Sequence, residues 1–236
     1  MRQAGWAVRV CVLVLLAITP TPAQAPDETA VIKSVDAAVA LRADILFGFT
    51  DTEHYAVFRG GDETHPVADM IVKDTYTKGV GKNYTILSKR GSSLVQHFGL
   101  QPLLDNEKQV NLPGNIEKSW FISSNYEMQL KPGSITQLDG RNCFVIAITA
   151  KHKATNTING TIWVDARDGT LVQIDGIATE NASVFSGATH MMRQYFNVNG
   201  LSMAKHARAE SDSSLIGRTV INIDYSNYHL QIAQPK

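Results

Sequence analysis

The stretch from Leu138 to Gly176 reads LDGRNCFVIAITAKHKATNTINGTIWVDARDGTLVQIDG. Within it, runs rich in β-branched and aromatic residues are separated by Asp139-Gly140, Asn159-Gly160 and Asp168-Gly169. Asn-Gly and Asp-Gly tolerate the positive φ that tight hairpin turns require. Together with Asn199-Gly200 further along the chain, these dipeptides favour an antiparallel meander over a parallel α/β sheet.

Outward from this stretch, an alternation of period two continues in both directions along the chain. In Val67–Thr77, for example, Met70, Val72 and Tyr76 share one face, and polar residues share the other, as in an antiparallel sheet wetted on one side. The predicted strands are His54–Arg59, Val67–Thr77, Asn83–Arg90, Tyr126–Leu130, Ile135–Leu138, Cys143–His152, Thr161–Asp165, Leu171–Gly176, Val184–His190, Met192–Val198, Met203–Ser211 and Arg218–Tyr225.

Two segments have helical patterns instead. Asp27–Phe47 carries its apolar residues mostly on one stripe, begins at residues typical of a helix start and is followed by Gly48. Ser92–Lys118 interrupts the strand pattern and indicates one or two short helices, broken near Gly99 and Pro102.

The run Cys143–Ile148 is apolar on both of its alternating rows, and so is Ile162–Val164. A strand of this kind must be covered on both faces of the sheet. One cover is the core, and the other could be a helix, a second sheet layer or a ligand. Helix cover is the expectation, because layered packing is the usual way to bury a sheet face.

The N-terminal 25 residues have the three-part layout of a secretory signal peptide. Arg2 and Arg9 precede the apolar run Val10–Ile18, and Ala23-Gln24-Ala25 offers a cleavage site after Ala23 or Ala25. The apolar run is well short of the roughly 20 residues that a spanning helix needs. We therefore expect a signal peptide over 1–25, a single domain over 26–236 without a transmembrane segment, and a periplasmic or extracellular location.

Composition and charge exclude several classes of function. The chain has 22 basic and 22 acidic residues and no basic cluster, which argues against nucleic-acid binding. Without Cys11 of the predicted signal peptide, Cys143 is the one remaining cysteine, so no internal disulfide can form. Cys143 lies in an apolar run and is expected to be a buried small residue rather than a reactive thiol.

The sequence contains no short motif for catalysis, phosphate binding or metal binding. There is no Gly-x-Ser-x-Gly elbow and no phosphate-binding glycine loop, and the seven histidines are scattered. Asp51, Glu53 and His54 are interpreted as a solvated strand edge, with the two carboxylates on one face. Asp165, Asp168 and Asp175 are interpreted as turn and strand-end residues rather than a catalytic pair. We therefore expect a protein that is not an enzyme and holds no cofactor or metal.

The order of elements and the central hairpins resemble those of the LolA-like superfamily, the periplasmic outer-membrane lipoprotein-sorting proteins and their relatives. The similarity lies in Leu138–Ile146, in Gly160-Thr161-Ile162-Trp163-Val164-Asp165 and in Leu171–Gly176. The resemblance implies an α+β, mainly antiparallel fold. Its strongly curved sheet, or incomplete barrel, would have an N-terminal helix and short helices over the concave side. It also implies an apolar cavity for a ligand such as a lipoprotein acyl chain.

The resulting hypothesis is an exported soluble carrier or sensor of the cell envelope that binds a lipid or other apolar ligand. Two alternatives remain open: an envelope protein-interaction module without a ligand, and a hydrolase with a dispersed active site. The residues predicted to line the ligand site are Phe144, Ile146, Ile148, Trp163, Met192 and Phe196.

Overall fold

The structure is a computed structural model that describes residues 26–154, 156–180, 187–213 and 217–233. The predicted signal peptide therefore lies outside the described residues. The strands are β1 (Leu46–Arg59), β2 (Ala68–Thr77), β3 (Gly81–Gly91), β4 (Tyr126–Leu138), β5 (Arg141–Ala150), β6 (Ile158–Asp165), β7 (Leu171–Ala178), β8 (Thr189–Val198), β9 (Leu201–Ser213) and β10 (Gly217–Ile232). The helical elements are α1 (Glu28–Ile45), α2 (Ser93–Val95), the π-helical turn η1 (Gln96–Leu100), α3 (Gln101–Val110) and the 3-10 turn η2 (Ile116–Ser119).

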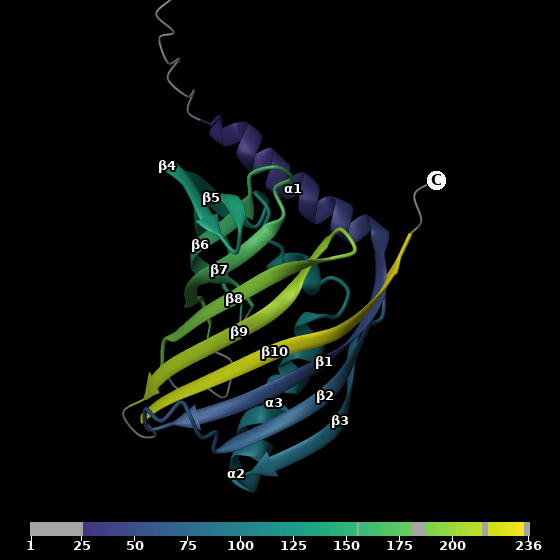
Figure 1. Ribbon diagram of the computed structural model, residues 1–236, viewed down its shortest axis with the longest axis vertical. Helices are drawn as coiled ribbons and strands as arrows, with labels where there is room; N and C mark the ends of the chain where they lie inside the picture. The colour runs from purple at the N-terminus through teal and green to yellow at the C-terminus, as the bar shows by residue number, and fades with distance from the viewer. Residues whose placement is uncertain (1–25, 155, 181–186, 214–216, 234–236) are drawn as a thin grey trace, which may run out of the picture.

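All ten strands form one antiparallel sheet in the order β3-β2-β1-β10-β9-β8-β7-β6-β5-β4. Every neighbouring pair is consecutive along the chain except β1 and β10, the first and last strands of the chain, which pair inside the sheet. Figure 1 shows that the sheet is strongly curved, while β3 and β4 lie at its two edges. The predicted fold class, a mainly antiparallel curved sheet with helices on the concave side, is confirmed.

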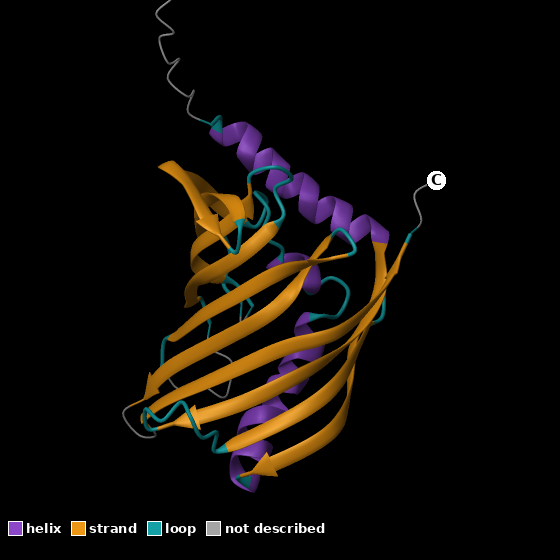
Figure 2. Cartoon of the chain, viewed as in Figure 1, coloured by secondary structure: helices purple, strands orange, loops and turns teal. Residues whose placement is uncertain are grey.

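Helix α1 begins as its sequence predicts, but it ends at Ile45 and not at Gly48, because Leu46 is already extended and Leu46 to Gly48 belong to β1. The Asp27 side chain accepts a hydrogen bond from the Thr29 backbone N–H, which satisfies one of the unpaired donors of the first turn. Val31 and Val35 are buried against the side chains of β5, β6 and β7, including Ile146, Ile162 and Ile174. The helix crosses one end of the concave face, where it covers the upper strands in Figure 2.

The second helical segment covers the other end of the concave face. Ser92 caps α2, and Pro102 occupies the first turn of α3, where its missing N–H is not needed. Val95, Leu100 and Leu104 from this segment pack against the inward row of β1 and β2, in a cluster that includes Tyr55 and Met70. The predicted helices in Ser92–Lys118 are thus confirmed, but the predicted break near Gly99 and Pro102 is wrong, because the backbone stays helical through the π-helical turn η1. These helices cover a core separate from the one under α1.

Helix α1 covers one face of the doubly apolar strand β5. Ile146 and Ile148 are buried in the cluster beneath α1, on the concave side. Cys143 and Val145, from the opposite row, are buried as well, and burial raises the pKa of the Cys143 thiol.

The hairpin predictions hold in three of four places. Asp139 and Asn199 have φ of 50°, and each is followed by a glycine with positive φ. Gly169 also has positive φ in the turn between β6 and β7. The prediction for Asn159-Gly160 is wrong, because both residues lie inside β6 and pair with β7. Gly160 is opposite Gly176, and a Cβ at residue 160 would lie 2.1 Å from the Asp175 carbonyl oxygen, so glycine permits close backbone approach there.

The strands at the C-terminal end differ in extent from their predictions. The prediction of separate strands over Val184–His190 and Met192–Val198 is wrong in the described part. There, a single strand, β8, runs without interruption through residues 189–198. Residues 184–186 lie outside the described residues. Strand β10 continues to Ile232, so that it pairs with the whole of β1. None of the helices in the described ranges is long and apolar enough to cross a membrane.

Candidate functional site

A cavity of about 480 Å³ lies between the concave face of the sheet and the helices. Residues of α1, α3 and the segment after α3 form one side, and residues of β1–β3 and β6–β10 form the other. Most of its lining residues are apolar, as is typical of sites for apolar ligands. Examples from the two sides are Val35, Ala38, Val39, Leu103, Phe121, Met191, Met203 and Ile223.

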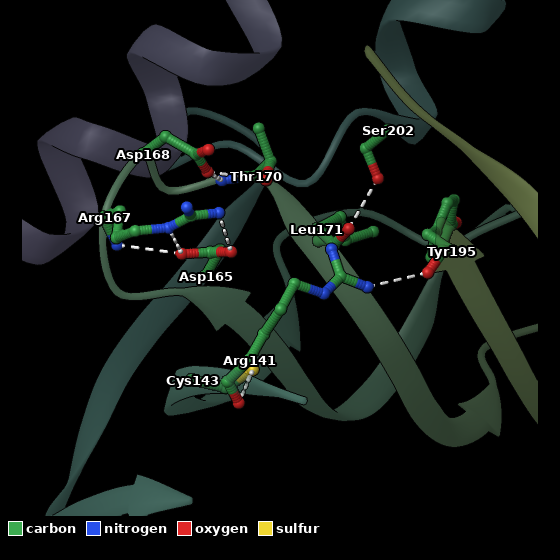
Figure 3. A network of polar contacts seen from close by, with 9 residues as sticks. All are labelled: Arg141, Cys143, Asp165, Arg167, Asp168, Thr170, Leu171, Tyr195 and Ser202. Atoms are coloured by element: carbon green, nitrogen blue, oxygen red, sulfur yellow. Dashed lines mark hydrogen bonds and ion pairs between the residues drawn. The ribbon is translucent and has the colours of Figure 1, made fainter. Parts of the chain in front are cut away.

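Polar contacts fix the turn between β6 and β7 at the rim of this cavity (Figure 3). Asp165 accepts hydrogen bonds from the Arg167 guanidinium at 3.1 and 3.2 Å, and Asp168 accepts one from the Thr170 backbone N–H at 3.0 Å. Gly169 lies directly against α1, since a Cβ there would be 2.5 Å from the Ser34 backbone. The turn therefore sets the position of α1 over the cavity.

Side chains of β5 and β9 also donate hydrogen bonds to backbone carbonyls of the neighbouring strands β8 and β7. Arg141 donates to the Tyr195 carbonyl oxygen at 2.8 Å, and the Ser202 hydroxyl donates to the Leu171 carbonyl oxygen at 2.5 Å (Figure 3). Asp175, the third carboxylate weighed from the sequence, pairs instead with His190 at 2.8 Å. Asp165, Asp168 and Asp175 thus each contact a different partner.

A buried charged cluster, which we call the Lys82 network, lies at one end of the cavity. The Lys82 ammonium contacts the carboxylates of Glu53 and Glu107 at 2.7 Å each, and it also contacts Asp74. Glu53 further accepts a hydrogen bond from the buried Tyr55 hydroxyl. Although burial alone would lower the pKa of Lys82, Glu107 and Glu53 raise it above its usual value. The ammonium is therefore charged and shared by three carboxylates.

Asp51 lies beside this network, and it is only 2 % exposed. Burial, and then the neighbouring Glu53 carboxylate, raise the pKa of Asp51 from 3.8 to about 7. Within the described residues, neither of its carboxylate oxygens makes a hydrogen bond of good geometry, although the Tyr228 hydroxyl is its neighbour. Near neutral pH, Asp51 is therefore balanced between its acid and its carboxylate.

The carboxylates of Asp51, Glu53 and Asp74 approach within 4.8 Å of one another, as metal ligands would. The Lys82 ammonium contacts two of the three. A cation of the chain itself thus already neutralises this group of carboxylates, which weakens the case for a metal ion there.

The interpretation of Asp51 and Glu53 as a solvated strand edge is wrong. They do share a face, as alternation predicts, but that face points into the molecule and both side chains are buried. A signal was present in the sequence: Phe49, Tyr55 and Val57 lie in the same alternating row. That row is the inward one, because it carries the larger apolar residues of β1 next to the carboxylates.

Two arginines also line the cavity. Arg42 of α1 donates to the Met203 sulfur at 3.9 Å, and burial lowers its pKa. Arg193 of β8 is surrounded by Tyr225 and Tyr195, which raise its pKa although burial opposes this. Neither residue could be selected from the sequence, because each becomes a cavity residue only through packing against distant elements.

Of the six residues predicted to contact a ligand, the structure places Met192 in the cavity lining. The other five lie elsewhere, so their contact with a ligand stays a prediction. Ile146 and Ile148 are buried beneath α1 with Phe144 packed against them, Phe196 packs in a cluster with Leu201 and Met203, and Trp163 is half-buried between Ile162 and Val164.

No family model matches the sequence, and no curated protein matches it. Three solved structures are similar over most of the chain. A LolA superfamily protein from Nitrosomonas europaea is 12 % identical, with 88 % of this chain and 94 % of that chain covered and a TM-score of 0.46. A lipoprotein-sorting protein domain from Vibrio parahaemolyticus is 10 % identical, with 87 % and 94 % covered and a TM-score of 0.47.

A DUF1329 family protein from Desulfovibrio piger is 14 % identical, with 86 % of this chain and 95 % of that chain covered and a TM-score of 0.44. At TM-scores below 0.5 these similarities carry no inference about ligand or activity. Two of these structures bear the LolA superfamily or lipoprotein-sorting name of the family that the sequence resembles.

Proposed function

We propose that the protein is an exported, non-enzymatic carrier or sensor that holds a lipid-like ligand in the cavity between α1, α3 and the concave face of the sheet. The observation that supports this is the cavity itself. About 480 Å³ of mostly apolar space remains between the two sides of the molecule. This volume lies within the range of roughly 300–1,000 Å³ that small-molecule sites occupy.

The charged groups at the cavity do not argue against an apolar ligand. No histidine lines the cavity in the part of the chain that the structure describes. Glu53 and Glu107 are already bound by Lys82, and the raised pKa of Asp51 lets it take up a proton near neutral pH. A buried charge that is paired adjoins apolar surface at a smaller loss of free energy than an unpaired one.

The proposal is tested by binding of a neutral fluorescent apolar probe, N-phenyl-1-naphthylamine, and by mass spectrometry of organic extracts from the purified mature protein. Ala38 lines the cavity, whereas Ala37, one position earlier on α1, is exposed. We expect Ala38→Trp to fill the cavity and weaken probe binding at least tenfold. Ala37→Trp, the matched control, should bind the probe like the wild type.

Two results would contradict the proposal: extracts without any lipid together with a probe that does not bind, or equal binding by the two tryptophan variants. The competing hypothesis is an interaction module of the envelope, for which the unpaired edges of β3 and β4 offer a docking site. It predicts a protein partner captured by crosslinking, and no thermal stabilisation by apolar compounds.

A further inference from the structure

Two guanidinium groups at the cavity have more hydrogen-bond donors than partners. Arginine carries five N–H donors and no acceptor. For Arg42, the contact within the described residues is the thioether sulfur of Met203, a weak acceptor. For Arg193, the buried Nε has no hydrogen-bond partner there.

Nor does a carboxylate of the protein neutralise either arginine directly. Among the described residues, neither Arg42 nor Arg193 forms an ion pair, while the cavity carboxylates Glu53 and Glu107 are bound to Lys82. Tyrosines surround both arginines: Tyr195 neighbours Arg42 and forms a side-chain hydrogen bond with Arg193, whose pKa the Glu107 carboxylate also raises. Both side chains are half-buried and line the cavity, so a ligand in the cavity could supply acceptors for their N–H groups.

Local pairing, rather than total charge, leaves the arginines without a counterion. Lys82, Arg42 and Arg193 equal Glu53, Asp74 and Glu107 in number, but all three carboxylates contact Lys82. The two arginines come from opposite sides of the cavity, one from α1 and one from β8. A group bound between them would be held by donors from both sides.

We infer that the cavity takes an amphiphile with an anionic headgroup, a carboxylate or a phosphate, that binds at Arg42 and Arg193. This rests on the proposed function, since the apolar chain of the same molecule would occupy the remainder of the cavity, beside Val35, Ala38 and Met191. Carboxylate and phosphate groups present the paired oxygens that match the planar guanidinium fork. Recognition by arginine then adds headgroup specificity to apolar binding.

The test compares four compounds with the same twelve-carbon chain: dodecanoate, dodecyl phosphate, dodecan-1-ol and dodecyltrimethylammonium. Each compound is added to the full mature protein loaded with N-phenyl-1-naphthylamine, at concentrations below the critical micelle concentration of that compound. Displacement of the probe measures the affinity of the compound. We expect the two anionic compounds to bind at least tenfold more tightly than the alcohol, and the cationic compound to bind most weakly. Inorganic phosphate and acetate, which lack the chain, should not displace the probe at millimolar concentration.

Substitution then assigns the headgroup site. Arg42→Gln and Arg193→Gln should each weaken binding of dodecyl phosphate about tenfold, with binding of dodecan-1-ol unchanged, which also reports that the variants are folded. Arg90→Gln, at an exposed arginine of β3, is the matched control and should change neither affinity.

The outcomes separate this inference from the proposed function. If all four compounds bind equally, or the cationic one binds most tightly, the headgroup inference is overturned and the apolar carrier stands. The four affinities are compared on the wild-type protein, so this outcome does not depend on whether a variant folds. If free phosphate binds as tightly as dodecyl phosphate, the site is one for a small anion and the amphiphile is excluded. If neither the probe nor any compound binds, both the inference and the proposed function fail.

Discussion

The Asp51 carboxyl at the cavity has a pKa close to neutral pH. Its pKa is about 7 in the folded protein and 3.8 in an unperturbed chain, so the folded state binds a proton more tightly than the unfolded state. Linkage then requires that stability from this group is complete below about pH 4 and falls as the pH rises to about 7. A shift of this size corresponds to at most about 4 kcal/mol, since one pKa unit is about 1.4 kcal/mol.

Asp51→Asn keeps residue 51 neutral at every pH. We expect its free energy of unfolding to exceed that of the wild type by roughly 1–3 kcal/mol at pH 8, with no such gain at pH 4. Urea denaturation at the two pH values measures this difference. Asp44→Asn, at an exposed carboxylate in the last turn of α1, should stay within about 0.5 kcal/mol of the wild type at both. Equal gains at pH 4 and pH 8 would show that Asp51 is not the titrating group.

Removal of Lys82 should change stability in the opposite direction from removal of the Asp51 charge, because Lys82 neutralises carboxylates instead of adding one. Lys82→Met leaves Glu53, Asp74 and Glu107 without their shared cation. Removing one partner of a buried ion pair typically destabilises by about 3–5 kcal/mol. We expect a loss of that size at pH 8 and a smaller one at pH 5, where carboxylates can take up protons. Lys89→Met, at an exposed residue of β3, is the control, and a Lys82→Met protein as stable as this control at pH 8 would contradict the prediction.

At the scale of single elements, the local pattern predicted most of the fold. The capping of α1, the alternation in β2 and the turns at Asp139 and Asn199 follow from residues adjacent in sequence, which is why they could be foreseen. Asn159-Gly160 fails for a non-local reason. The same dipeptide that favours a turn also permits close backbone approach, and only pairing with β7 decides between the two.

That close approach makes Gly160 a test of the β6–β7 pairing. A Cβ at residue 160 would lie 2.1 Å from the Asp175 carbonyl oxygen and 2.5 Å from the Gly176 Cα, so the strands would have to separate. We expect Gly160→Ala to lower the free energy of unfolding by about 1–3 kcal/mol or more. Gly140→Asn is the control, since that turn has free space and Asn tolerates its positive φ. A Gly160→Ala protein as stable as the control would mean that residue 160 lies in a turn after all.

At the scale of the whole molecule, the candidate site depends on contacts that no local pattern records. The cavity exists only where α1, α3 and strands from both ends of the chain meet. Arg42 and Arg193 are 151 residues apart in sequence. Of the six residues predicted to contact a ligand, only Met192 is among those lining the cavity, and contact of all six with a ligand stays a prediction. Neither the cavity wall nor its polar end could be assigned from local patterns.

The pairing of β1 with β10 makes a final prediction about the chain as one cooperative unit. Strand β10 is the one link in the sheet between β3-β2-β1 and the other six strands, because it pairs with β1 on one side and β9 on the other. A chain that ends at Ser213 would expose two new sheet edges and open the apolar cluster of Tyr55 and Ile223. We expect this truncation to abolish the cooperative urea transition followed by circular dichroism, whereas removal of residues 234–236 should leave it unchanged. A cooperative transition retained by the shorter chain would show that the strands before β10 fold without it, and that residues 26–236 are not a single domain.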